Sequence, residues 1–161
     1  LMENTVKTVR RISAELRPSV LDDLGLVVAM DLQLKELEKR SGICTKLTAP
    51  KREPVLPAAV KNGMFRIFQE SLTNVARHSG ASKVIVTFEN KNGKIVLTIK
   101  DNGSGFDEKK AAEKRTLGVL GMKERANVMG GEYLISGEPG KGTTIVVSVP
   151  VNETVEYTIK S

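Results

Sequence analysis

Aromatic side chains are scarce in this sequence. Its 161 residues include no tryptophan, two tyrosines and four phenylalanines. Three of the phenylalanines, Phe65, Phe68 and Phe88, fall at apolar positions of predicted core elements. Proteins that bind single-stranded nucleic acids stack successive bases on exposed aromatic rings. The net charge of +6 is also not gathered in a basic tail, so we expect no nucleic-acid partner.

Cysteine and long apolar runs are the next absences. Cys44 is the single cysteine, so the chain cannot form an internal disulfide, which is typical of a reducing compartment. No apolar run approaches the ~20 residues that a membrane span requires, and no signal-peptide pattern opens the chain. We therefore predict a cytoplasmic location and no membrane contact by this stretch. Because Leu1 precedes Met2 inside a helical pattern, we expect a fragment of a longer protein, whose other parts could include a membrane anchor.

Two amphipathic stripes precede the main part of the chain. Apolar side chains at alternating three- and four-residue steps predict a helix over residues 3–16 that packs on another helix. Pro18 ends this helix, and a second stripe predicts that helix resumes after Ser19 or Gly25, as a connecting helix that stops at the glycine cap Ser41-Gly42. The stripes consist of Val6, Val9, Ile12 and Leu16, and then of Val27, Met30, Leu34 and Leu37. We divide the chain into a helical stub (residues 1–18), a connecting helix (19–42), one globular domain (43–150) and a tail (151–161).

Hairpins dominate the pattern of the globular part. The turn Asn90-Lys91-Asn92-Gly93 lies between two alternating apolar runs and is a strong hairpin signal. Antiparallel hairpins argue against a doubly wound parallel sheet. The predicted fold class is α/β, a two-layer sandwich of a mixed, mostly antiparallel sheet with helices on one face. The predicted elements are strands at 43–48, 83–89, 94–100, 132–136 and 143–149, helices at 58–78 and 119–129, and a mobile lid between Asp101 and the second of these helices.

Asp101 comes directly after a predicted strand and is followed by two glycines. Alternation over Lys94–Lys100 places Asp101 at the strand end. Gly103 and Gly105 let backbone approach a flat ligand, and a carboxylate there can accept a hydrogen bond from an exocyclic amine such as that of adenine. Taken alone, an Asp-Asn-Gly sequence is more often a turn that ends a strand. The interpretation as a nucleotide site depends on its partner motifs.

The predicted helix 58–78 carries a polar face near its end. Glu70 and Asn74 are four residues apart and therefore share a face, which Arg77 and His78 continue one turn later. Carboxylate and amide oxygens suit magnesium, and arginine suits phosphate. In isolation this face is more often simply solvated.

Four motifs in this order resemble the GHKL ATP-binding family in its sensor histidine kinase branch, over most of residues 44–150. The segment Glu15–Leu26 further resembles the leader that follows the dimerisation helices in kinases of the nitrate-sensor type. On this resemblance, residues 1–18 are the stub of the second dimerisation helix, and 43–150 are the ATP-binding catalytic domain. The motifs are Glu70-Ser71-Leu72-Thr73-Asn74, Asp101-Asn102-Gly103-Ser104-Gly105-Phe106, Leu117–Ala126 and Gly140-Lys141-Gly142-Thr143-Thr144.

The resemblance implies roles for residues beside the adenine. Asp101 would hold the adenine amine, and Gly103 and Gly105 would leave room for the ring. Thr143 resembles the threonine that supports the aspartate and an adenine-bound water, with Thr144 the weaker candidate. Both threonines also suit an ordinary strand.

The resemblance also implies roles beside the phosphates. Asn74 would be the magnesium ligand, Glu70 the catalytic polar group beside metal and γ-phosphate, and Arg77 a phosphate contact. His78 would hydrogen-bond near the nucleotide or simply cap its helix. Gly118 and Gly121 would offer backbone N–H groups to the phosphates near a helix N-terminus.

The implied function is that of the catalytic domain of a two-component sensor histidine kinase with ATP and Mg²⁺ as cofactors. Its partners would be the histidine-bearing dimerisation domain of its own homodimeric full-length chain and a response regulator. The sole histidine, His78, lies in the nucleotide helix, so this stretch lacks an acceptor histidine and should not phosphorylate itself. The alternatives are another GHKL protein, such as an anti-sigma serine kinase or an ATP hydrolase, and a nucleotide-binding interaction module without turnover.

Overall fold

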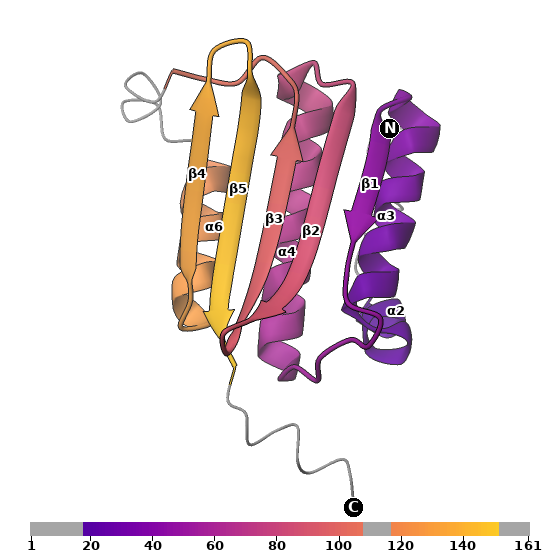
Figure 1. Ribbon diagram of the computed structural model, residues 1–161, viewed down its shortest axis with the longest axis vertical. Coiled ribbons are helices and arrows are strands. Elements are labelled where there is room, and N and C mark those ends of the chain that lie inside the picture. The colour runs from indigo at the N-terminus through magenta and orange to yellow at the C-terminus, as the bar shows by residue number, and fades with distance from the viewer. Residues whose placement is uncertain (1–17, 108–116, 152–161) are drawn as a thin grey trace, which may run out of the picture.

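The computed structural model describes residues 18–107 and 117–151 and shows one five-stranded sheet (Figure 1). The strands run in the order β1-β2-β3-β5-β4. β1 is parallel to β2 and the other three pairs are antiparallel, so the predicted mixed, mostly antiparallel sheet is confirmed. The strands are β1 (Cys44–Thr48), β2 (Lys83–Lys91), β3 (Lys94–Asp101), β4 (Glu132–Glu138) and β5 (Gly142–Pro150).

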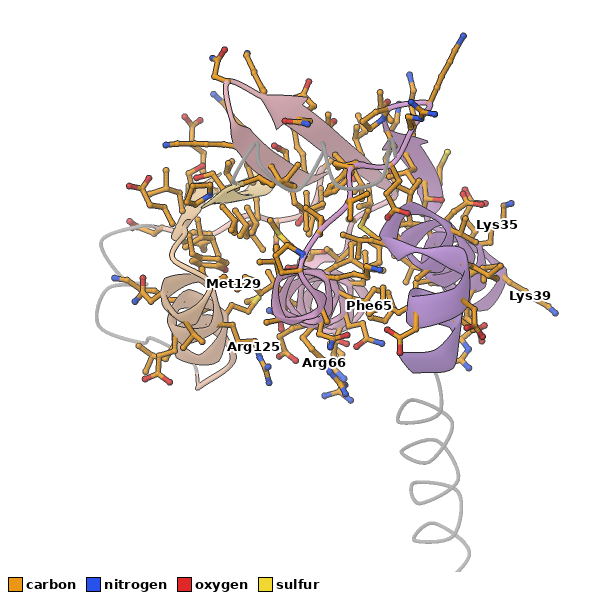
Figure 2. The ribbon with its side chains drawn as sticks, turned by 90° about the horizontal axis from the view of Figure 1, so that it is seen from below. Lys35, Lys39, Phe65, Arg66, Arg125 and Met129 are labelled. Carbon is orange, nitrogen blue, oxygen red and sulfur yellow. The ribbon has the colours of Figure 1, made fainter. Side chains whose placement is uncertain are left out.

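Helices cover one face of this sheet (Figures 1 and 2). α3 lies behind β1, α4 behind the centre of the sheet, and α6 behind β4 and β5. The predicted one-sided, two-layer arrangement is therefore correct. The helices are α2 (Pro18–Leu24), α3 (Leu26–Ser41), α4 (Ala58–Asn74) with the π-helical turn η1 (Val75–Ser79), and α6 (Leu117–Val128).

Alternation along the strands builds the core. Every second residue of β2, β3 and β5 is buried on the helical side, while the residues between them are exposed or half-buried. Phe68 and Met64 of α4 meet this layer fully buried. The hairpin between β2 and β3 turns at Asn92 and Gly93, with φ of 54° and 73°, as their sequence predicts.

The connecting region consists of two helices, α2 and α3, which are separated at Gly25. The Glu53 carboxylate accepts a hydrogen bond from the backbone N–H of Val27, in the first turn of α3, at 3.0 Å. Thus a carboxylate from a distant loop satisfies one of the free N–H groups that start α3. Pro18 is the first residue of α2 that the structure describes, so the helix end predicted there lies at the border of the described residues. Leu26 and Met30 belong to the same hydrophobic core as the sheet residues.

Three predicted segments lie outside the described residues. They are the helix at 3–16 with its seam, most of the lid (108–116) and the tail from residue 152. The helix predicted over 58–78 is confirmed in α4, but its last turn is π-helical. A π-turn has i→i+5 hydrogen bonds in place of i→i+4, so Arg77 is rotated relative to the face that a continuous α-helix would give it.

Candidate functional site

Four chain segments end at the same edge of the sheet. β3 ends at Asp101, β5 begins at Gly142, α4 and η1 end at Ser79, and α6 begins at Leu117. The backbone N–H of Ser104 donates to the carbonyl of Ser79 at 2.7 Å, and that of Gly140 donates to the carbonyl of Ser104 at 2.7 Å. The fold thus brings together three of the motifs that the sequence predicts to form one site.

Asp101 is a buried carboxylate at this edge, 6% exposed. Its Oδ1 accepts the backbone N–H of Gly103 at 2.8 Å, which turns the chain away from the strand. Asn102 anchors the same turn, because its Oδ1 accepts the backbone N–H groups of Ser82 and Lys83 at 2.9 Å. The carboxylate is therefore held in a fixed direction by the start of β2 and by its own loop.

Glycines around Asp101 are required by close backbone approach. A Cβ at Gly103 would overlap the carbonyl oxygen of Ser79, and one at Gly105 would overlap that of Glu138. At Gly142, where φ is 93°, a Cβ would overlap the carbonyl oxygen of Asp101 itself. These positions pack backbone on backbone, so the loop that carries Asp101 is fixed from two sides.

Strand alternation separates the two candidate threonines. Thr143 lies two residues before the buried Ile145, so it shares the helical face of the sheet with Asp101. Thr144 points to the opposite face, where it pairs with Lys100 on β3 and Ser136 on β4. Of the two, only Thr143 lies on the side from which a ligand of Asp101 would approach.

On the helical side of the site, Glu70 meets the start of α6. A Cβ added at Gly118 would lie 2.8 Å from the Glu70 Oε1 atom. Asn74 is half-buried one turn further along α4, and Arg77 is exposed in η1. His78 belongs to the backbone of η1, and its side-chain placement lies outside what the structure describes. Glu70, Asn74 and the start of α6 therefore border the same edge as Asp101.

The two glycines of α6 have different surroundings. A Cβ added at Gly118 would meet the Glu70 carboxylate, whereas one added at Gly121 would meet nothing within 4 Å. Gly121 lines a groove beside α4.

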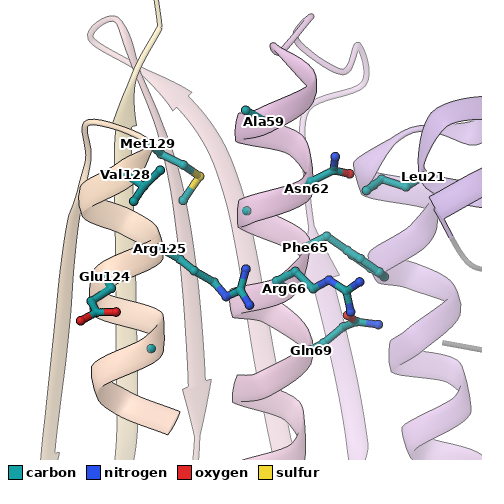
Figure 3. Close-up of a pocket in the computed structure, with 12 residues that line it drawn as sticks. Leu21, Ala59, Asn62, Phe65, Arg66, Gln69, Glu124, Arg125, Val128 and Met129 are labelled. Carbon is teal, nitrogen blue, oxygen red and sulfur yellow. The ribbon is translucent and has the colours of Figure 1, made fainter. Parts of the chain in front are cut away.

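This groove, of about 580 Å³, runs between α4 and α6 (Figure 3). It extends from Ala59 and Met129 to Gln69, and Arg66 and Arg125 line it from the two helices. Among the predicted site residues only Gly121 borders it. The groove therefore occupies the opposite part of the α4–α6 contact from Asp101 and Glu70.

Sequence reasoning missed two residues that shape the site. Ser79 supplies the carbonyl that receives Ser104 N–H, and its hydroxyl donates to the Val75 carbonyl at 2.6 Å. Asn102 ties the Asp101 turn to β2. The signal for Asn102 was present, since asparagine after a strand commonly bonds neighbouring backbone. Ser79 gave no signal, because its partner is 25 residues away.

No cluster of three or more His, Cys, Asp or Glu residues suited to a metal occurs among residues 18–107 and 117–151. Magnesium does not need one, since it is usually held by one or two protein oxygens together with water and substrate phosphates. The amide oxygen of Asn74, one turn beyond Glu70 on α4, is a ligand of the kind that such a site uses.

Comparisons with known proteins agree with this geometry. Residues 59–153 match the family described as histidine kinase-, DNA gyrase B-, and HSP90-like ATPases. The chain belongs to this ATPase family. Its ATP-binding domain thus accounts for the fold and for the motifs gathered at the sheet edge. No helix in the described part of this ATPase is long and apolar enough to cross a membrane.

Relatives of this ATPase domain include signalling kinases. The chain is 37% identical over 151 residues to the signal transduction histidine-protein kinase/phosphatase DegS of Brevibacillus brevis. It is 38% identical over 151 residues to the sensor histidine kinase MctS of Rhizobium johnstonii. The alignments cover 94% and 92% of this chain but only 39% and 32% of those proteins. The chain therefore spans about a third of the length of these relatives.

Solved structures share the fold at lower identity. The histidine kinase domain of a blue-light activated histidine kinase from Erythrobacter litoralis has a TM-score of 0.66 at 18% identity, over 78% of this chain and 61% of that one. The Acinetobacter baumannii histidine kinase AdeS has a TM-score of 0.67 at 15% identity, over 94% of this chain and 83% of that one. At these identities the likeness concerns the fold alone.

Proposed function

We propose that this chain is the ATP-binding catalytic domain of a two-component sensor histidine kinase. It presents the γ-phosphoryl group of ATP to a histidine of the dimerisation domain, for relay to an aspartate of a response regulator. The observation that carries the proposal is the buried carboxylate of Asp101, aimed and held at the edge where α4 and α6 also end. The relatives DegS and MctS, which are named as histidine kinases, support the kinase reading over other ATPases.

The sheet side of the site binds the adenine. The Asp101 carboxylate accepts a hydrogen bond from the exocyclic amine, and Thr143 lies on the same face to support it. Gly103 and Gly105 allow the loop that carries Asp101 to pack closely on the backbone of Ser79 and Glu138, which holds the carboxylate in place for the ring. A buried, fixed acceptor discriminates adenine from bases that carry an oxygen at this position, because an acceptor facing an oxygen would stay unpaired.

The helical side binds the phosphates. Backbone N–H groups near the start of α6, with that of Gly118 among them, receive phosphate oxygens at the positive end of the helix dipole. Asn74 holds magnesium, which neutralises phosphate charge when it is bound, and Arg77 adds a positive charge from η1. Glu70 orients the reacting end of the nucleotide. Catalysis then rests mainly on positioning and charge neutralisation.

A mutation at Asp101 tests the adenine assignment. We expect Asp101→Asn to keep the fold, because it keeps the shape of the side chain, but to present a donor where the adenine amine needs an acceptor. A mismatched buried polar group costs about 1–3 kcal/mol, or roughly a five- to hundredfold loss of affinity. Calorimetric titration with a non-hydrolysable ATP analogue measures it. Unchanged affinity would overturn the assignment.

A mutation at Asn74 tests the metal assignment separately. We expect Asn74→Ala to bind adenosine like the wild type but to lose the gain in ATP affinity that Mg²⁺ provides, since only the metal ligand is removed. The measurement is a pair of titrations with and without Mg²⁺. Equal metal enhancement in both proteins would contradict the role of Asn74.

The transfer reaction itself needs an acceptor from outside this stretch. Incubation with Mg-ATP and a histidine-containing helical bundle distinguishes the readings by mass analysis and by product. Phosphohistidine on the bundle supports the kinase, and free ADP without labelled protein supports an ATP hydrolase. Acid-stable label on an added serine-containing partner supports an anti-sigma-type kinase, and binding without any product supports an interaction module. Label at His78 would contradict the proposed division of labour.

A further inference from the structure

A buried sulfur atom joins three elements beneath the nucleotide site. The Met122 side chain of α6 is 1% exposed. Its Sδ atom lies 3.6 Å from the hydroxyl of Ser71 on α4 and 3.9 Å from the hydroxyl of Tyr133 on β4. Ser71 and Tyr133 are themselves buried, at 0% and 8% exposure. One side chain thus contacts both neighbours of α6 through polar atoms.

This cluster lies next to the contact between Glu70 and Gly118. Ser71 directly follows Glu70 on α4, and Met122 follows Gly118 by four residues, or about one helical turn. Where the Met122 sulfur meets Ser71 therefore fixes where the first turn of α6 meets Glu70. Neither Ser71 nor Met122 has to touch a nucleotide to have this effect.

The chemistry of the cluster favours methionine over a hydrocarbon of equal size. A thioether sulfur is a weak hydrogen-bond acceptor, and leucine has none. The Tyr133 hydroxyl donates to this sulfur. The Ser71 hydroxyl also donates to the Ile67 carbonyl at 2.7 Å, so it has a second acceptor within its own helix. Loss of the sulfur would leave the Tyr133 hydroxyl buried without that acceptor.

We propose that Met122, through Ser71 and Tyr133, is a positioning residue that holds the phosphate-binding start of α6 in register with α4. The inference rests on the proposed function, because it concerns the phosphate half of the ATP site. The adenine half is built by β3, β5 and the end of η1, none of which contributes to this cluster. Disturbing the cluster should therefore weaken phosphate binding and spare adenine binding.

The experiment compares Met122→Leu with Met30→Leu. Both substitutions remove the sulfur of a buried methionine and keep its volume, but Met30 lies in α3, away from the site. Titration with adenosine and with Mg-ATP gives two affinities for each protein. We expect Met122→Leu to weaken Mg-ATP binding about three- to tenfold and adenosine binding less than twofold. Met30→Leu should leave both affinities unchanged.

A double-mutant cycle tests whether the three residues act together. Ser71→Ala and Tyr133→Phe should each weaken Mg-ATP binding about two- to fivefold alone, and add little once Met122 is leucine. If Met122→Leu does not fold, as judged by circular dichroism, these two milder variants give the same comparison on their own.

Two results would overturn the inference. One is an equal loss of adenosine and Mg-ATP affinity, which would mean that Met122 has only a general packing role. The other is an unchanged Mg-ATP affinity in all three variants. Failure of the wild-type protein to bind either ligand would instead refute the proposed function, so the two failures are distinguishable.

Discussion

On the sheet side of the proposed nucleotide site, the backbone of one segment packs directly on the backbone of another. On the helical side, the exposed carboxylate of Glu70 packs on the turn of α6 that carries Gly118. Gly105 and Gly142 each leave no space for a Cβ because a carbonyl oxygen occupies it. At Gly118 the neighbour is the far end of the Glu70 side chain, which can move. The two halves therefore differ in how much change they tolerate.

This difference suggests a division between a preformed and an adjustable half. On the proposed assignment, an adenine site made of packed backbone would be ready before the ligand arrives, which would reduce the cost of ordering on binding. A phosphate site made of side chains and a helix terminus can shift as the transferred group changes its position. Substitutions should accordingly damage the fold on the sheet side and mainly the chemistry on the helical side.

The largest expected effect is at Gly142. We expect Gly142→Ala to lower the free energy of unfolding by about 3 kcal/mol, because the methyl group meets the Asp101 carbonyl at a φ of 93°. Gly140→Ala is the matched control, since its φ is 77° but nothing lies within 4 Å of its added Cβ. It should cost only about 1–2 kcal/mol for the backbone conformation. Urea unfolding of both variants measures the difference, and equal losses would mean that the close contact is unimportant.

A smaller and different effect is expected at Gly118. Alanine in a helix is favoured over glycine by up to about 1 kcal/mol, so Gly118→Ala should unfold no more easily than the wild type. The added methyl displaces Glu70, whose Oε1 atom lies 2.8 Å from the Cβ position. We expect Mg-ATP affinity to fall roughly five- to tenfold, or about 1 kcal/mol, with adenosine affinity unchanged. A loss of stability as large as that of Gly142→Ala would remove the contrast between the halves.

The smallest effect is on the free energy of unfolding at high pH, and it concerns Tyr133, whose hydroxyl contacts Met122 of α6. Burial raises the pKa of Tyr133 to about 12, from the ordinary value of about 10. The unfolded chain then loses the phenolic proton first, so stability is unaffected below about pH 10 and falls between about pH 10 and pH 12. Between pH 9 and pH 11, the wild type should lose about 1 kcal/mol more than Tyr133→Phe. Parallel pH dependences in urea unfolding would show that the phenol is not protected.

Much of the fold could be predicted because it depends on local pattern. The β2–β3 turn at Asn92-Gly93 and the one-sided burial of the strands follow from residues that are neighbours in the sequence. The sequence left open whether the connecting helix resumes after Ser19 or after Gly25. The start of α3 after Gly25 is stabilised by Glu53, 26 residues beyond the N–H group that it receives, so neighbouring residues alone could not decide. The π-helical turn η1 was also missed, since an α-helical spacing was assumed up to His78.

In the candidate site, too, the features set by local pattern could be predicted and those set by distant contacts could not. Motif order predicted that Asp101, Asn74, Gly118 and Thr143 would meet, because each stands at the end of an element that the pattern identified. The resemblance already ranked Thr143 above Thr144, and the register of β5 against β3 supplies a physical reason, because only Thr143 shares the face of Asp101. Sequence reasoning assigned Met122 no role, because its polar partners come from two other elements.

The proposed nucleotide site draws on β3, β5, α4 and α6, which are separate in the sequence and meet only in the folded domain. A ligand that binds only this complete arrangement shifts the folding equilibrium of the whole domain toward the native state. At a free concentration one hundred times its dissociation constant, such a ligand adds about 2.7 kcal/mol to stability. For a domain of this size that is a substantial share of the total. The nucleotide would thus also serve as a folding ligand, so cellular energy charge would influence how much of the protein survives proteolysis.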